Sequence, residues 1–146
     1  MIYSWTVQPV KGAMAEVTVA ELTAQASDII RGDVTAIESY WNESETFIFT
    51  GVTLKVAQIF KGELTIPSEI TVEIPGGKVG DIGLGVEHAP HFETGQQVIL
   101  FLSEQNDSTY HVTGWEKGKF TLEKETVKET GKTISSFQDE INQALK

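Results

Sequence analysis

The sequence predicts a mainly β fold, a small antiparallel barrel of five or six strands with a short N-terminal helix and a C-terminal helix. Apolar and polar residues alternate over much of the chain, which is the period of a strand. One such run, residues 47–60, is long enough to curve around a barrel. At 146 residues and 40% apolar composition, the chain suits one compact domain, residues 1–146. A β-sandwich is the alternative architecture.

The predicted structure begins with a helix and a strand. Thr18 and Glu21 match a capping box, in which each side chain accepts the backbone N–H of the other residue. A short helix is expected to follow. Residues 29–37 are rich in β-branched side chains, which predicts the first strand.

The clearest strand signal covers residues 47–60, in which Ile48, Val52, Leu54, Val56 and Phe60 share one parity. Gly51 within this run predicts a bulge or bend. Residues 69–74 alternate polar side chains with Ile and Val until Pro75 ends the run. These two runs are expected to pair as a hairpin.

Residues 75–95 interrupt the strand signals with many glycines, two histidines and several acids. Ile82, Leu84 and Val86 alternate with other residues, glycine among them, which predicts a loosely packed barrel strand. Residues 87–94 are expected to form a mobile loop. The whole segment is predicted to be part of the protein's working surface.

The later strands complete the predicted barrel. Residues 97–102 are apolar at both parities, which predicts a central strand covered on both faces. Residues 109–115 and 119–122 predict two further strands about a break at 117–118. The barrel then extends over about residues 18–123.

The C-terminal part of the chain predicts a helix that docks on the barrel. Residues 124–133 are mostly polar and charged, and we expect them to be flexible. A helix is predicted over residues 135–145, with Ser135 or Ser136 as its N-cap. Apolar side chains recur every four residues along one face of this helix: Phe137, Ile141 and Leu145.

An OB-like topology fits these strands better than a sandwich does, although residues 75–95 replace the helix that an OB-fold usually carries between its third and fourth strands. Spaced glycines and apolar residues occur at 26–32, 50–56, 60–62, 76–77, 90–92, 95, 101–102 and 114–120. This spacing resembles an uncharacterised OB-like domain of predicted exported and cell-surface proteins of bacteria and methanogenic archaea. The resemblance implies a shared fold over about residues 18–123 and supplies no catalytic residue.

Composition excludes several classes of function. The net charge is −10, and the acid excess lies in residues 1–116, so the surface repels phosphate backbones and we expect no nucleic-acid binding. The absence of cysteine excludes disulfides, thiolate metal sites and cysteine nucleophiles. No apolar run approaches a membrane span, and residues 1–10 lack the features of a signal peptide. We therefore expect no membrane insertion.

A cluster of histidines and acids within residues 81–93 is a candidate metal site. His88 and His91 are three positions apart, with Glu87 and Glu93 beside them and Asp81 nearby. Imidazole and carboxylate groups are suitable ligands for Zn²⁺. The frames Glu-x-x-His and His-Glu-x-x-His are missing, so a solvated loop without metal is the favoured interpretation.

Motifs for other chemistry are incomplete. The glycines of residues 76–85 expose backbone N–H groups, yet they complete no phosphate-loop pattern and no helix signal follows them. Neither Gly-x-Ser-x-Gly nor Ser-x-x-Lys occurs. We expect no cofactor, and the sequence favours a noncatalytic protein over an enzyme.

Aromatic residues offer a candidate binding platform. Tyr40 and Trp41 lie where the first predicted strand runs into the polar residues 42–45, and an indole is hard to bury at a loop tip. Trp5 and Trp115 are better explained as core residues. The predicted binding residues are therefore Tyr40, Trp41, Asp81, His88 and His91.

Together these features predict a noncatalytic β-barrel module, a binding or structural domain of a surface or exported protein that is a monomer. We expect an unidentified protein or carbohydrate as its ligand. N-glycosylation patterns at Asn42 and Asn106 fall in predicted turns and favour an extracellular or cell-surface location over a cytoplasmic one. The alternatives are a metal-dependent enzyme built on residues 81–93 and a cytosolic adaptor that binds a peptide strand at a barrel edge.

Overall fold

A computed structural model describes residues 17–106 and 109–146. Five strands form a closed ring in the order β1-β2-β3-β7-β6, with β6 pairing back to β1. The pairings are antiparallel except for that between β3 and β7. The ring strands are β1 (Asp28–Trp41), β2 (Ile48–Lys61), β3 (Ser68–Pro75), β6 (Gln97–Asn106) and β7 (Thr109–Val112). The predicted mainly β fold is confirmed.

The long strands β1 and β2 bend because their pairing is irregular. Register shifts occur at Ile29/Ile30, Arg31/Gly32 and Val34/Ala36. Gly51 is not one of these positions, because it pairs in regular register with Glu38 on one side and Glu73 on the other. A Cβ at Gly51 would lie 3.4 Å from Cε2 of Tyr40. The bulge predicted there is therefore wrong, and a side chain at this position would make an ordinary contact with the Tyr40 ring.

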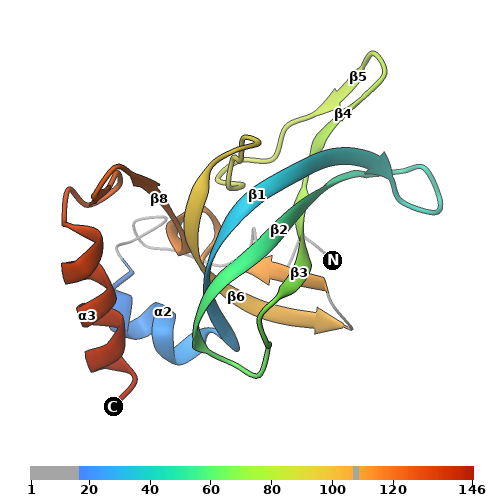
Figure 1. The fold of residues 1–146 in the computed structure, drawn as a ribbon. Coiled ribbons are helices and arrows are strands. Elements are labelled where there is room, and N and C mark those ends of the chain that lie inside the picture. The colour runs from blue at the N-terminus through green and yellow to red at the C-terminus, as the bar shows by residue number, and fades with distance from the viewer. Residues whose placement is uncertain (1–16, 107–108) are drawn as a thin grey trace.

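The ring has one core inside it and a second core outside it. Alternate residues of β6 serve both, as predicted: Val98, Leu100 and Leu102 join the inner core, whereas Ile99 and Phe101 join the outer one. The outer core is covered by α2 (Val19–Gln25), α3 (Ile134–Ala144) and β8 (Lys119–Glu123). Figure 1 shows both helices on the same side of the ring.

The caps of the two helices differ in how well the sequence predicted them. The capping box of α2 is confirmed, since Glu21 N donates to Thr18 Oγ1 over 3.0 Å and Thr18 N donates to Glu21 Oε1 over 2.9 Å. The N-cap of α3 is Thr133, whose Oγ1 accepts the N–H of Ser136 over 3.0 Å. The predicted Ser135 or Ser136 cap is wrong because both serines lie inside the first turn of the helix.

The segment before α3 is more structured than its polar composition indicates. The short strand β9 (Thr126–Val127) pairs with β8, and Val127 is fully buried in the outer core. The Glu129 carboxylate accepts both the N–H and the hydroxyl of Thr121, over 2.7 and 2.9 Å. These contacts fasten residues that the sequence led us to expect as flexible.

The C-terminal ends of β7 and β1 also differ from the prediction. The strand expected over residues 109–115 ends at Val112, and a 3-10 helix, η1 (Trp115–Gly118), leads into β8. Strand β1 continues four residues beyond Ile37 to Trp41, because residues 37–41 pair fully with β2. This longer strand changes the setting of the predicted aromatic platform.

No helix lies between β3 and β6, as the sequence led us to expect. The glycine-rich segment begins instead with a separate two-stranded sheet, β4 (Gly77–Val79) and β5 (Ile82–Leu84). This hairpin projects from the ring (Figure 1), and Ile82 is 54% exposed on it. The predicted strand around residues 82–86 is therefore shorter than expected and belongs to the hairpin rather than to the ring.

Candidate functional site

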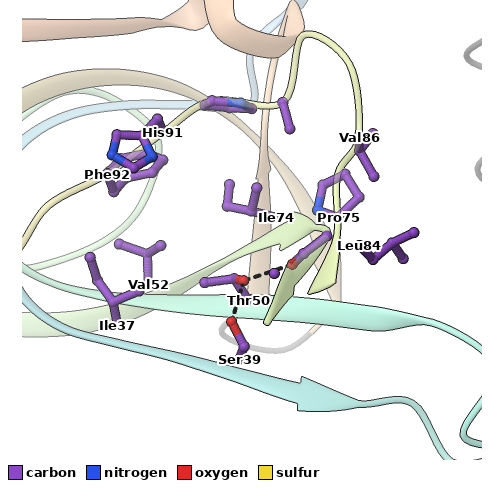
Figure 2. A pocket seen from close by; sticks show the side chains of 14 residues that line it. Ile37, Ser39, Thr50, Val52, Ile74, Pro75, Leu84, Val86, His91 and Phe92 are labelled. Carbon is purple, nitrogen blue, oxygen red and sulfur yellow. Dashed lines mark hydrogen bonds between the residues drawn. The ribbon is translucent and has the colours of Figure 1, made fainter. Parts of the chain in front are cut away.

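A pocket of about 330 Å³ lies where the glycine-rich segment meets the ring. Its walls are largely apolar, and they come from β1, β2, β3, the β4–β5 hairpin and the loop that follows the hairpin (Figure 2). The apolar side chains that define it are Ile37, Val52, Ile74, Leu84, Val86 and Phe92. We call this the ring-end pocket.

Strand register explains why β1 and β2 form one wall of the ring-end pocket. Ile37 pairs with Val52, and Ser39 pairs with Thr50, so the four side chains lie on one face of the two strands. The same parity on β2 places Val52 in the inner core. The pocket is therefore a continuation of the inner core toward solvent.

A chain of hydrogen bonds closes one end of the ring-end pocket. Thr50 donates its hydroxyl proton to the Gly76 carbonyl over 2.7 Å, so the Ser39 hydroxyl is the donor in its 2.8 Å bond to Thr50 (Figure 2). Lys78 N in turn donates to Ser39 Oγ over 3.4 Å. These bonds fix the start of β4 against β1 and β2. Among residues 17–106 and 109–146, neither hydroxyl bonds a histidine or a carboxylate, the partners that activate a hydroxyl as a nucleophile.

Lys119 fastens the loop that covers the ring-end pocket. Its ammonium group donates to the His91 carbonyl and lies 4.8 Å from the centre of the Phe92 ring. Burial lowers the pKa of Lys119. Phe92 is buried, and Gly95 N donates to the Val34 carbonyl over 2.9 Å. The loop expected to be mobile is thus tied to β8 through Lys119 and to the inner core through Phe92.

Lys119→Met is expected to loosen this loop while the ring stays folded. Methionine keeps most of the apolar stem but cannot donate to His91, and loss of a charge-assisted bond costs about 1–2 kcal/mol. Amide exchange of Ala89 should accelerate about tenfold, with Leu100 unchanged. Lys117→Met, at an exposed position of η1, is the control. Equal exchange at Ala89 in both variants would show that Lys119 does not hold the loop.

The two histidines of the predicted metal cluster have different neighbours. His88 Nδ1 lies 3.0 Å from Glu116 Oε2 and its Nε2 lies 4.0 Å from Glu87 Oε2. His91 lines the ring-end pocket, and its Nε2 lies 3.6 Å from Glu93 Oε2. The two imidazoles therefore contact different carboxylates, and no carboxylate contacts both of them in these ion pairs.

Asp81 lies at the turn between β4 and β5. Across residues 17–106 and 109–146, no group of three His, Asp or Glu side chains is arranged to hold a metal ion. Of the five predicted binding residues, only His91 lines the ring-end pocket.

Tyr40 and Trp41 are the last residues of β1 and pair with β2, so they do not form a loop tip as predicted. The Tyr40 hydroxyl donates to Glu73 Oε2 over 2.9 Å, and His111 Nε2 lies 3.7 Å from Glu73 Oε1. This Tyr40–Glu73–His111 cluster joins three ring strands. Trp5 lies outside the described residues.

The cluster has perturbed pKa values with clear causes. Hydrogen bonding to His111 is the main cause that lowers the pKa of Glu73; partial burial opposes it, and the Tyr40 hydroxyl adds to it. Partial burial together with the Glu73 carboxylate raises the pKa of Tyr40 to about 12. Glu73 is thus ionised, and Tyr40 is a neutral donor, at physiological pH.

A second pocket, of about 280 Å³, lies beside this cluster. It shares Ile74, Pro75 and Pro90 with the ring-end pocket and is also lined by Glu73 and His111. The β3–β7 pairing extends over only two residue pairs. The second pocket lies where these strands separate.

Glu73→Gln is expected to destabilise the protein by about 1–2 kcal/mol at pH 7, because it removes a partly buried, charge-assisted acceptor. The folded-state pKa lies below the ordinary value of 4.5. The stabilisation that ionised Glu73 supplies is therefore fully present above pH 4.5 and is lost as the pH falls through the folded-state pKa. Urea unfolding at several pH values should show the difference from wild type vanish in acid. Glu69→Gln, at an exposed position of β3, should have nearly the wild-type free energy of unfolding at every pH. If Glu73→Gln is less stable than wild type by the same amount at every pH, the ionised Glu73 carboxylate is not the source of the stabilisation.

No family model matches the chain, and no curated protein matches it. Within the part of the chain that the structure describes, no helix is long and apolar enough to cross a membrane. The fold and the ring-end pocket define a small β-rich domain with a preformed, largely apolar cavity.

Residues 75–95, which the sequence predicts to be part of the working surface, supply much of the ring-end pocket, whereas four of the five predicted binding residues lie outside it. The opposite wall, Ile37 and Val52, was assigned only to strands. Parity along the sequence does not find Ile37, because it comes three positions after Val34; the register shift at Val34/Ala36 brings both side chains to one face, where Ile37 pairs with Val52.

Proposed function

We propose that this protein is a noncatalytic binding module, a domain of a surface or exported protein, and that the ring-end pocket holds part of its ligand. The observation that supports this most is a pocket of about 330 Å³ with apolar walls, whose polar end is fixed by its own hydrogen bonds. Small preformed apolar cavities with few polar groups are typical of ligand sites. The Ser39 and Thr50 hydroxyls at that end bond each other, the Gly76 carbonyl and the Lys78 N–H.

The proposed surface location rests on the sequence resemblance and on the two N-glycosylation patterns. The structure makes Asn42 a poor acceptor for a glycan. Its Oδ1 accepts the N–H groups of Thr46 and Phe47, and its Nδ2 donates to Thr46 Oγ1 over 3.1 Å. Of the two asparagines, Asn106 is therefore the better candidate for glycosylation. Mass spectrometry of the protein expressed through a eukaryotic secretory pathway should detect a glycan at Asn106 and not at Asn42.

Filling the pocket tests the proposed function. Val86→Trp places an indole in the ring-end pocket, whereas Ile82→Trp places the same group at an exposed position of the neighbouring β4–β5 hairpin. The probes are a displayed library of random peptides and an array of oligosaccharides. Ligands selected with the wild-type protein should bind Ile82→Trp equally and Val86→Trp at least about tenfold more weakly.

Two outcomes would overturn the proposed function. One is equal binding of the selected ligands to both tryptophan variants, which would place the site elsewhere. The other is recovery of no ligand from either probe collection. Matching unfolding midpoints of the two variants would exclude loss of folding as the cause of weaker binding.

A further inference from the structure

One edge of β1 is paired over only part of its length. Residues Asp28 to Asp33 pair with β6, and Val34 then exchanges two backbone bonds with the loop before β6, to Gln96 O and from Gly95 N, both over 2.9 Å. From residue 36 to residue 41, β1 pairs with β2 on its other side only, among the residues that the structure describes. We call residues 36–41 of this edge the open edge.

The register determines which backbone groups point out of the open edge. In an antiparallel pair, residues alternate between bonding the partner strand and pointing away from it. Asn42 N donates to Phe47 O over 2.9 Å, so Tyr40 and Glu38 also bond β2. The N–H and C=O groups of the intervening residues Ile37, Ser39 and Trp41 consequently point away from β2.

Two residues with outward backbone groups also line the ring-end pocket with their side chains. Ile37 and Ser39 both belong to the wall formed by β1 and β2, and Ile37 is 36% exposed. A strand added at the open edge would run beside this wall. Every second side chain of the added strand would then point to the pocket side of the sheet.

The charges near the open edge indicate the composition of the added strand. Glu38 is exposed on the face of β1 opposite the pocket, and Glu43 and Glu45 are exposed in the turn that follows β1. The whole chain carries a net charge of −10. Basic side chains on the face away from the pocket would be attracted to these acids, whereas a second copy of this edge would bring acid against acid.

We infer that the ligand of the proposed binding function is an extended peptide that adds to the open edge of β1 as a further strand. It alternates apolar side chains, one of which enters the ring-end pocket, with basic side chains on the opposite face. Backbone bonds to Ile37, Ser39 and Trp41 supply sequence-independent affinity, and the pocket supplies specificity, as in other cases of strand addition. This inference rests on the proposed function and adds the class of partner.

The test uses the full chain and the peptide acetyl-Lys-Val-Lys-Leu-Lys-Val-Lys-amide, with a copy that has glutamate in place of lysine as the charge control. A series of peptides carries one backbone N-methyl group at each position in turn. Methylation removes a donor and blocks strand pairing only where the N–H points to β1. We expect Kd to rise about fivefold or more at alternate positions and to change little between them. The glutamate peptide should bind at least about tenfold more weakly.

Amide exchange of the protein supplies the second readout. In the free protein, Ile37 and Ser39 should exchange faster than Glu38 and Tyr40, and saturating peptide should slow Ile37 and Ser39 selectively. Slow exchange of Ile37 and Ser39 in the absence of peptide would overturn the inference. If this protection increases with protein concentration, a second copy covers the open edge. If it is independent of protein concentration, another part of the same chain covers the edge.

The remaining outcomes separate this inference from the proposed function. A uniform effect of N-methylation, or no binding of the lysine peptide at all, would overturn strand addition. If Val86→Trp nevertheless weakens binding of an oligosaccharide or of a peptide without the alternating pattern, the proposed function stands and only the strand inference fails. If Val86→Trp has no effect on any ligand, the proposed function fails as well.

Discussion

Phe137→Ala is expected to lower the free energy of unfolding by about 3–5 kcal/mol, the usual cost of deleting a fully buried aromatic side chain. Phe137 is 0% exposed, and its ring lies 4.6 Å from that of Phe120, between centroids. Ile141, also 0% exposed, packs in the same outer core. Urea unfolding at pH 7 measures the effect as a shift of the midpoint with little change in slope.

Leu145→Ala is the matched control, because Leu145 is the C-cap residue of α3 and is 36% exposed. Its substitution should cost less than about 1 kcal/mol. If the two variants unfold at the same midpoint, α3 does not dock through Phe137, and the outer core described above is wrong.

Gly77→Ala is expected to destabilise the protein by about 2–4 kcal/mol and to distort the ring-end pocket. Gly77 has a φ of +141°, which residues with a side chain rarely adopt, and an added Cβ would lie 2.3 Å from Thr50 Oγ1 and 2.4 Å from Ser39 Oγ. Either the hydroxyl bonds break or β4 moves away from β1. Thermal unfolding measures the stability, and amide exchange of Lys78 reports the position of β4.

Gly83→Ala provides the comparison within the same hairpin. An added Cβ at Gly83 meets no atom within 4 Å, so this substitution should change stability by less than about 0.5 kcal/mol. Equal stability of the two variants would show that the start of β4 is not held against Ser39 and Thr50. The hydrogen bonds of Ser39 and Thr50 would then not close the polar end of the pocket.

The elements that the sequence predicted well depend on local patterns. The capping box requires only Thr18 and Glu21, three positions apart. The β2–β3 hairpin follows from alternation on both sides of a short turn, and the central position of β6 follows from apolar residues at both parities. In each case, neighbouring residues carry the whole signal.

The elements that the sequence missed depend on contacts between distant segments. The Tyr40–Glu73–His111 cluster requires the registers of β1, β2, β3 and β7 together, including a parallel pairing that no local pattern encodes. Strand β9 consists of Thr126 and Val127 alone, too short for a sequence pattern, and it pairs with β8. The predicted binding residues Asp81 and His88 were chosen for their chemistry, whereas the pocket is made of ordinary apolar residues.

Methyl NMR of the wild-type protein, with the tightest ligand selected from either probe collection, measures whether the ring-end pocket holds part of the ligand. Intermolecular contacts should appear at the methyl groups of Ile37, Leu84 and Val86, all of which line the pocket. Contacts confined to Val112, in the second pocket, or to the exposed Ile66 would contradict this placement of the ligand.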